Sequence, residues 1–464
     1  MNASIHIVAM PYPGRGHINP MMNLAKLLLA HNSNILVTFV VTEEWLGFIG
    51  SEPKPDNIRF ATIPNVIPSE HGRADNFVAF IEAVSTKMEA PFEVLLHRLQ
   101  PLPTYIIYDP FLFWVVPVAN RFNIPVASFW VMSASVFAVF QYYDLLKKNG
   151  HYPVNASENG DKLVNYIPGN SSIPLADIPL SDESWRTSRL LERTLNIIPW
   201  VHKSQCLLFT TIYELEPRAI DALKAEFSIP IYTIGPSIPI YTIGPSIPCF
   251  GDGHITTLST NHDDLDYFHW LDKQPKASVL YISQGSFLST SSAQIDEIAM
   301  GLKESGVGFL WVSRGENSRL RNMCGDKGLV LPWCEQLRVL LHPSIGGFWS
   351  HCGWNSTKEG VYSGVPFLTF PIFMDQPINS KFIVKEWKVG WRVKNEVKDE
   401  TLITRDEVAR LIKRFMDLDS DEGKYMRKRA RELQQICQNA IANGGSSETG
   451  VNAFLKQILQ AVKP

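Results

Sequence analysis

The sequence has few cysteines, little excess charge and no long hydrophobic run, and each of these shortages excludes a class of protein. Its six cysteines are scattered over 464 residues without a CxxC pair, so we expect reduced thiols rather than a disulfide framework. The formal net charge of −3 gives no reason to expect nucleic acid or an acidic membrane as a partner. No run approaches the roughly 18–20 apolar residues that span a bilayer, and the N-terminus lacks the basic and apolar regions of a signal peptide. These features predict a cytoplasmic protein without a membrane span.

The chain is too long for a single hydrophobic core, because single cores stop growing at about 250–300 residues. In the first half, short β-rich runs alternate with helical patterns, beginning with a strand at 4–11 and a helix at 19–32. Further strands are predicted at 34–42, 105–109, 125–130 and 206–211. These runs are apolar on both faces, which is typical of a parallel sheet covered by helices on both sides.

The same alternation restarts after an irregular, Pro/Gly-rich tract at 229–262. Strands of a second parallel sheet are predicted at 278–286, 308–315, 328–333, 345–350 and 366–371, and 404–461 is helical. Two doubly wound α/β domains of this kind place a cleft between the carboxyl ends of both sets of strands, where ligands of such sheets bind.

Within the irregular tract, "IPIYTIGPS" occurs twice in tandem, at 229–237 and at 238–246. The first copy suits a strand that leads out of the first domain, whereas the second has no obvious place in a sheet. A stacked repeat architecture needs more than two copies. We therefore interpret the pair as a recent duplication or an error in the sequence, and expect one copy to be a loop.

Polar side chains gather in "SHCGWNSTKEG" (350–360), between a predicted strand and a predicted helix. Such a turn favours phosphate, because a helix N-terminus offers unpaired N–H groups and a positive partial charge. Asn355 and Ser356 suit both helix capping and phosphate binding, and His351 can donate to a further phosphate oxygen. Glu359, one turn later, can accept hydrogen bonds from a ribose diol.

Three more residues flank this run at the ends of neighbouring strands. Trp333 follows the strand at 328–333 and can stack on a base, whereas Asp375 and Gln376 follow the strand at 366–371 and suit sugar hydroxyls. Taken singly, each residue of the group has an ordinary structural explanation: packing for a tryptophan, capping for Asn and Ser, a solvated helix position for Glu. Their joint spacing favours a nucleotide-sugar site.

From Trp333 to Gln376 the sequence resembles the nucleotide-sugar signature box of plant family-1 UDP-glycosyltransferases, including its 44-residue length. The similarity extends to "GRGHINP" near the N-terminus and "SVLYISQGSF" at the start of the second sheet. Two positions depart from the family pattern without touching the chemistry: Glu335, where Pro is usual, and Gln284, where Phe is frequent. The donor ligands that the resemblance implies are Trp333 and Cys334 at uracil, Gln336 and Glu359 at ribose, His351, Asn355, Ser356 and Ser286 at the diphosphate, and Trp354, Asp375 and Gln376 at the sugar.

The resemblance also implies a GT-B fold, in which two Rossmann-like domains face each other across a cleft. The implied boundaries are an acceptor-binding domain at 1–237, a linker at 238–262, a UDP-sugar-binding domain at 263–445, and a C-terminal helix at 446–464 that packs back on the first domain. The expected activity is inverting transfer of a sugar, by preference glucose, from UDP-sugar to a hydroxyl of a flavonoid, phenol, terpenoid or hormone. No metal or other cofactor is expected.

Sugar transfer to a neutral hydroxyl requires a base, and a histidine suits that task near neutral pH. His17 follows the first strand, and Asp109 ends the strand at 105–109 on the same edge of the sheet. A carboxylate there can orient the imidazole and stabilise its protonated form. Alone, His17 is more often a cap or surface residue, and Asp109 can equally cap the following helix. The resemblance assigns His17 as the catalytic base and Asp109 as its partner.

The sequence predicts the residues of the acceptor pocket less clearly than those of the donor site. Aromatic residues crowd one part of the first domain, and we expect a minority of them to line an apolar pocket: Phe111, Phe113, Trp114, Phe129, Trp130, Phe137, Phe140, Tyr142 and Tyr143.

Three other interpretations are weighed against this one. "GRGHIN" half-matches a dinucleotide fingerprint, with Glu43 or Glu44 as the ribose acid, so an NAD-dependent oxidoreductase is an alternative. A non-catalytic nucleotide-sugar binder is a second. Cys334, His342, His351 and Cys352 lack the close pairing of a zinc site.

Overall fold

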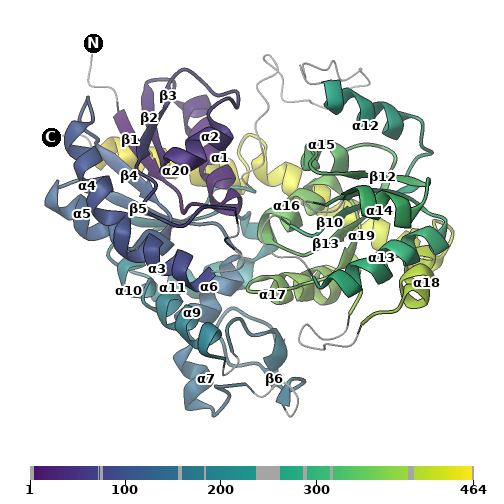
Figure 1. The fold of residues 1–464 in the computed structure, drawn as a ribbon. Helices are drawn as coiled ribbons and strands as arrows, with labels where there is room; N and C mark the ends of the chain where they lie inside the picture. Colours follow the sequence, from purple (N-terminus) through teal and green to yellow (C-terminus); the bar gives the residue numbers. More distant parts are fainter. Residues whose placement is uncertain are drawn as a thin grey trace.

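Two parallel β-sheets, one in each half of the chain, form the framework of the protein (Figure 1). A computed structural model describes residues 5–71, 73, 77–154, 159–181, 184–236, 262–285, 290–313, 317–394 and 402–461. Strand β9 (Ile231–Thr233) lies in the first copy of the tandem repeat. The second copy, Ser286 and nearly all of the linker predicted at 238–262 lie outside the described residues.

The first sheet has seven strands in the order β3-β2-β1-β4-β5-β8-β9, and all of its pairs are parallel. Its other strands are β1 (Ile5–Met10), β2 (Ile35–Thr42), β3 (Ile58–Ile63), β4 (Tyr105–Tyr108), β5 (Val126–Trp130) and β8 (Cys206–Phe209). Every residue of β1 is buried, because helices cover both faces.

Helices α1 (Arg15–His31), α2 (Glu43–Ile49) and α20 (Ser446–Ala461) pack on one face of this sheet. Helices α3 (Phe77–Lys87), α4 (Glu89–Arg98) and α5 (Val115–Arg121) pack on the other.

The second sheet has six parallel strands in the order β12-β11-β10-β13-β14-β15. These are β10 (Val279–Ser283), β11 (Gly308–Val312), β12 (Gly328–Leu331), β13 (Ile345–Ser350), β14 (Phe367–Thr369) and β15 (Gly390–Arg392). Helices α13 (Ser292–Ser305), α14 (Asn317–Cys324) and α18 (Arg405–Met416) cover one face. The other face is covered by α15 (Gln336–Leu340), α16 (Trp354–Ser363), α17 (Gln376–Lys381) and α19 (Asp421–Ile441).

Both sheets have the same topological switch point. The chain runs from β1 outward through β2 and β3 and then returns to place β4 on the other side of β1. In the second sheet, β13 is placed beside β10 in the same way. A crevice opens where the order reverses, at the carboxyl ends of the strands, and it is the usual ligand site of such sheets.

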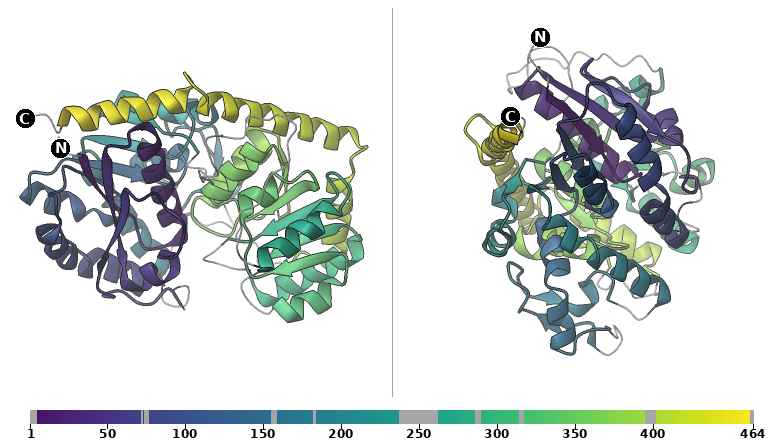
Figure 2. Two further views of the ribbon diagram at one scale, coloured as in Figure 1. Left: turned by 90° about the horizontal axis from the view of Figure 1, so that it is seen from above. Right: turned by 90° about the vertical axis from the view of Figure 1, so that its left-hand side faces the viewer.

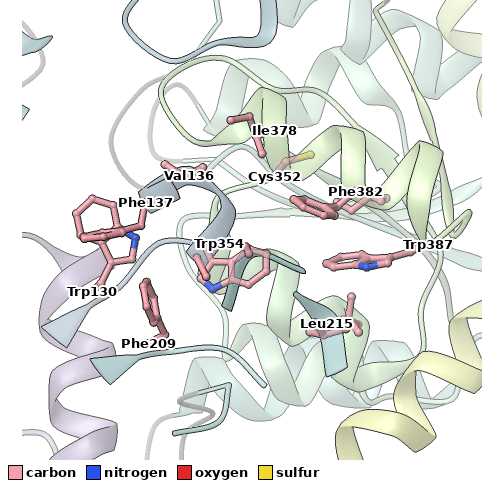
Figure 3. Packing of buried hydrophobic residues seen from close by; sticks show 14 of the residues in the cluster. Trp130, Val136, Phe137, Phe209, Leu215, Cys352, Trp354, Ile378, Phe382 and Trp387 are labelled. Atoms are coloured by element: carbon pink, nitrogen blue, oxygen red, sulfur yellow. The ribbon is translucent and has the colours of Figure 1, made fainter. Parts of the chain in front are cut away.

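The two domains share one continuous buried cluster. It contains Trp130, Phe137 and Phe209 from the first domain and Trp354 and Trp387 from the second, and Figure 3 shows these side chains lying on both sides of the domain boundary.

Polar contacts and the C-terminal helices also join the domains. Arg392 forms a largely buried ion pair with Asp177, at 2.9 Å. At the end of the chain, α19 and α20 run along both domains (Figure 2), and α20 packs against β9 and α1.

One buried cation in this interface forms no hydrogen bond with the described part of the chain. Lys358 on α16 is 2% exposed, and within the described residues its Nζ makes no hydrogen bond. Burial lowers the pKa of Lys358 to about 7, although the charges of Glu359 and Glu216 oppose this. The carboxylate of Glu216 already accepts hydrogen bonds from the backbone N–H groups of Ala134 and Ser135.

Replacing this cation is expected to stabilise the protein. The pKa of a lysine in an unfolded chain is about 10.4, so between pH 7 and 10 the unfolded state binds more protons at Lys358, and stability rises with pH. Lys358→Met keeps the volume and removes the charge. We expect it to raise the free energy of unfolding at pH 7 by an amount on the order of a few kcal/mol.

Thermal unfolding at pH 7 and pH 9.5 checks this expectation. The gain should be smaller at pH 9.5, and Lys424→Met, at an exposed position of α19, should change neither midpoint. A lower midpoint for Lys358→Met, or an equal gain at both pH values, would contradict it.

Candidate functional site

A cavity of about 980 Å³ lies between the carboxyl edges of the two sheets. The first domain lines it with residues that follow β1 and β5, and the second with residues that follow β10, β12, β13 and β14. Apart from Ser286, every residue predicted to bind the donor lines this cavity, and so does His17. Asp109 lies behind His17. The arrangement brings together residues separated by more than 300 positions in the sequence.

His17 and Asp109 form a tight pair. Nδ1 of His17 lies 2.6 Å from Oδ2 of Asp109, which is 1% exposed. The second carboxylate oxygen accepts a hydrogen bond from the backbone N–H of Phe111 and caps the short helix Pro110–Leu112. Asp109 therefore both caps a helix and orients the imidazole. Because a carboxylate only accepts, Nδ1 carries the proton and Nε2, unbonded among the described residues, is left basic.

The position of His17 depends on an irregularity in α1. The helix begins at Arg15, four residues before the predicted start, so Pro20 lies in its second turn rather than at its beginning. Proline has no N–H, so the carbonyl of Gly16 loses the helical donor that residue 20 would otherwise supply. That carbonyl instead accepts a hydrogen bond from Nδ2 of Asn355, at 2.9 Å. The first turns of α1 and α16 are thus joined across the cleft.

Neither Asn355 nor Ser356 caps α16, so the ordinary capping explanation weighed for them does not apply. Gly353 occupies the N-cap position of α16 without a side-chain cap, and the two polar residues lie inside the first turn. Their side chains are therefore available to other partners. The backbone N–H groups of this turn have no partner within the helix, which makes it suited to a diphosphate.

His351 is held between two glycines. A Cβ atom added at Gly285 or Gly353 would lie 2.6 or 2.5 Å from its Nε2, so larger residues would displace the ring. Burial lowers the pKa of His351 to about 4, outweighing the nearby Ser283 carbonyl. At neutral pH this histidine is uncharged, so it can serve a phosphate as a neutral hydrogen-bond donor rather than as a cation.

The residues predicted to bind ribose form one network. Nε2 of Gln336 donates to Glu359, at 2.7 Å, and to Ser356, at 3.0 Å, while the Tyr281 hydroxyl donates to Oε1 of Gln336. Burial raises the pKa of Glu359. Next to this network, Trp333 is 56% exposed.

The sugar end of the site is built by the loop after β14. Asp375 is buried and accepts a hydrogen bond from Nδ2 of Asn379, at 2.7 Å. Burial raises the pKa of Asp375 to about 6. Oε1 of Gln376 accepts from the backbone N–H groups of Ile372 and Phe373, which leaves its Nε2 as the group that can donate to a ligand.

The acceptor side is an apolar chamber bounded by α3, by α9 (Trp185–Leu195) and by the residues after β1, β5 and β14. Of the nine aromatic residues considered from the sequence, only Phe111 lines the cavity within the described chain. Most of the others belong to the core, because they face the sheet and its covering helices. Among the cavity-lining rings that the sequence interpretation missed, Tyr12, Phe77 and Phe373 belong to this chamber. Phe373 lies inside the signature box and Tyr12 just before "GRGHINP", whereas no sequence signal marks Phe77.

The alternative chemistries find little support. Among the described residues, no group of three or more His, Cys, Asp or Glu side chains is placed to hold a metal ion. Glu44, considered as a ribose acid, already accepts hydrogen bonds from Ser69 and from the backbone of Glu70.

Within the described residues, no helix combines the length and the apolar character needed to cross a membrane.

Known proteins resemble this chain in sequence and in structure. Residues 251–420 match the family model "UDP-glucoronosyl and UDP-glucosyl transferase". UDP-glycosyltransferase 87A1 of Arabidopsis thaliana is 50% identical over 98% of this chain and 100% of its own. Among solved structures, Medicago truncatula UGT71G1 complexed with UDP-glucose has a TM-score of 0.80 at 27% identity, covering 98% of both chains. Phytolacca americana UGT2, complexed with UDP-2-fluoro-glucose and pterostilbene, has a TM-score of 0.79 at 26% identity, covering 98% of this chain and all of the other.

The exposure of Trp333 yields a prediction about ligand binding. A tryptophan that packs against little of the protein contributes little to folding, whereas stacking on a base is worth about 1–3 kcal/mol. We expect Trp333→Ala to leave the unfolding midpoint unchanged and to weaken UDP binding by roughly tenfold to a hundredfold.

Isothermal titration calorimetry with UDP measures this affinity. Tyr425→Ala is the matched control, because Tyr425 on α19 is a similarly exposed ring outside the cavity, and it should bind UDP like the unaltered protein. Equal UDP affinity for Trp333→Ala and this control would show that Trp333 does not stack on the uracil of UDP.

Proposed function

Because the chain belongs to the plant family-1 UDP-glycosyltransferases, we propose that it transfers glucose from UDP-glucose to a hydroxyl of a small apolar plant metabolite, with inversion at the anomeric carbon. Flavonoids, phenols, terpenoids and hormones are the acceptor classes considered. The observation that carries the proposal is the His17–Asp109 pair, which faces the cavity opposite the donor turn. The choice of glucose is supported by the structural relative complexed with UDP-glucose and by Gln376 at the end of the signature box.

In the proposed reaction, Nε2 of His17 takes the proton of the acceptor hydroxyl as its oxygen attacks the anomeric carbon. The bond from that carbon to the diphosphate breaks, and UDP leaves with the electron pair. Asp109 stabilises the imidazolium through Nδ1. The N-terminus of α16 and the neutral His351 meet the charge that develops on the leaving diphosphate. No step requires a metal ion or another cofactor.

The proposed donor contacts follow the order of the UDP-sugar. Trp333 stacks on uracil beside the Cys334 backbone, and the Gln336–Glu359 pair binds ribose. The diphosphate is held by His351, Asn355 and Ser356. Trp354, Asp375 and Gln376 face the hexose. A cytoplasmic location is also proposed, supported by the five described cysteines, which are free thiols.

Removing the base tests the proposed mechanism. General bases contribute about 10²–10⁴-fold to rate, so His17→Ala should lower kcat by that factor while UDP affinity changes little. His31→Ala is the control, because His31 is an exposed histidine at the other end of α1. A loss of less than about tenfold for His17→Ala would reject the assignment.

The raised pKa of Asp375 predicts a pH dependence of donor binding. An ionised carboxylate accepts stronger hydrogen bonds from sugar hydroxyls than a protonated one. Asp375 is mostly ionised at pH 7.5 and becomes protonated as the pH falls through about 6. The affinity for UDP-glucose relative to the methyl ester of UDP should therefore fall several-fold between pH 7.5 and pH 5.

Calorimetry with both ligands measures the ratio. The methyl ester of UDP serves as the internal reference because it has the charge of UDP-glucose but no hexose, whereas the terminal phosphate of UDP itself titrates near pH 6. In Asp375→Asn the ratio should be independent of pH. A ratio that stays constant in the unaltered protein would show that Asp375 does not contact the sugar.

A further inference from the structure

One cation is placed in the wall of the apolar chamber. The helices α3 and α9, together with the residue pair after β5, line the chamber with Phe77, Ile81, Val131, Met132, Leu190 and Thr194, all uncharged. Within the described residues, Arg193 on α9 is the only charged side chain that these elements contribute to the cavity. A guanidinium beside aromatic and aliphatic walls attracts anions more strongly than one in open water.

The present partner of Arg193 holds it loosely. Nη2 lies 3.3 Å from Oε1 of Glu82 on α3, which exceeds the usual length of a charge-assisted hydrogen bond. Arg193 is 24% exposed and Glu82 is 49% exposed, so solvent screens this pair, and pairs of this kind are worth about 0–1 kcal/mol. Glu82 itself does not line the cavity. A ligand anion inside the chamber can therefore compete for the guanidinium.

We propose that the chamber selects acceptors bearing a carboxylate away from the reacting hydroxyl, and that Arg193 binds this carboxylate. A planar carboxylate matches the two-pronged donor geometry of arginine. The proposal rests on the proposed function, since it names the acceptor class of the same site.

The placement of the elements separates the two ends of such an acceptor. His17 lies at the start of α1 against the rings of Tyr12 and Phe111, whose centroids are 5.0 Å and 6.0 Å from its own. Arg193 lies on α9, which packs against α3 and α6 (Ala134–Gln141), and in the view of Figure 1 α9 lies farther from α1 than α3 does. The hydroxyl end meets His17, the apolar body occupies the chamber, and the carboxylate meets Arg193. The product is a glucoside with a free carboxylate rather than a glucose ester.

Matched acceptors test this inference. A panel pairs hydroxy acids on phenolic and terpenoid skeletons, beginning with 4-hydroxycinnamate, with their methyl esters. Each is supplied with UDP-glucose, and the kcat/KM ratio of acid to ester is measured for every skeleton that yields product. We expect this ratio to be about ten or more in the unaltered protein and to fall at least about tenfold in Arg193→Met, mainly through the KM of the acid.

Two variants separate charge recognition from a general disturbance of α9. Arg193→Lys should recover part of the ratio, and Glu82→Gln, which removes the competing carboxylate, should keep or raise it. Esters turned over as well as acids, or an equal loss for both in Arg193→Met, would overturn the inference while leaving the glucosyltransferase assignment intact. Failure of every acid and every ester to give product would reject the proposed function itself.

Discussion

The hydrogen bond from Asn355 to the Gly16 carbonyl is the contact on which the geometry of the cleft depends. It exists because Pro20 leaves that carbonyl without a helical donor. In most helices a proline at this point only weakens the element. Here the freed acceptor joins the two helix N-termini that carry the proposed base and the proposed phosphate ligands. The apolar cluster behind the cleft and the C-terminal helices α19 and α20 hold the two domains together. The Asn355–Gly16 hydrogen bond sets how the first turns of α1 and α16 lie relative to each other.

Burial then determines which groups in the cleft are charged. His351 is neutral at pH 7 because burial lowers its pKa, and Asp375 becomes neutral only below about pH 6, because burial raises its pKa to that value. Asp109, in contrast, is placed to stabilise a proton on the neighbouring imidazole. A neutral His351 beside the diphosphate avoids the cost of a buried unpaired cation there, since each such ion is expensive. The helix N-terminus supplies the positive potential without a mobile cation.

Much of this architecture was readable from the sequence, because strands buried on both faces leave continuous apolar runs. The strand predicted at 34–42 is observed at Ile35–Thr42, and the donor residues gather because they follow adjacent strands. The start of α1 was predicted too late because Pro20 is typical of a first helical position. The edge strand β3 was missed, since its partly exposed residues give no such run. The apolar chamber was unreadable, because Tyr12, Phe77 and Phe373 come from separate loops and helices and only the folded chain brings them together.

The anomeric configuration of the product tests the central claim most directly, that an acceptor activated by His17 attacks a sugar held on the opposite domain. UDP-glucose carries an α-linked sugar, and nuclear magnetic resonance of the first product formed reads the new linkage. A single displacement across the cleft predicts a β-glucoside for every acceptor. An α-glucoside would require either a second displacement through a protein nucleophile or attack from the face that the diphosphate leaves, and would contradict the account.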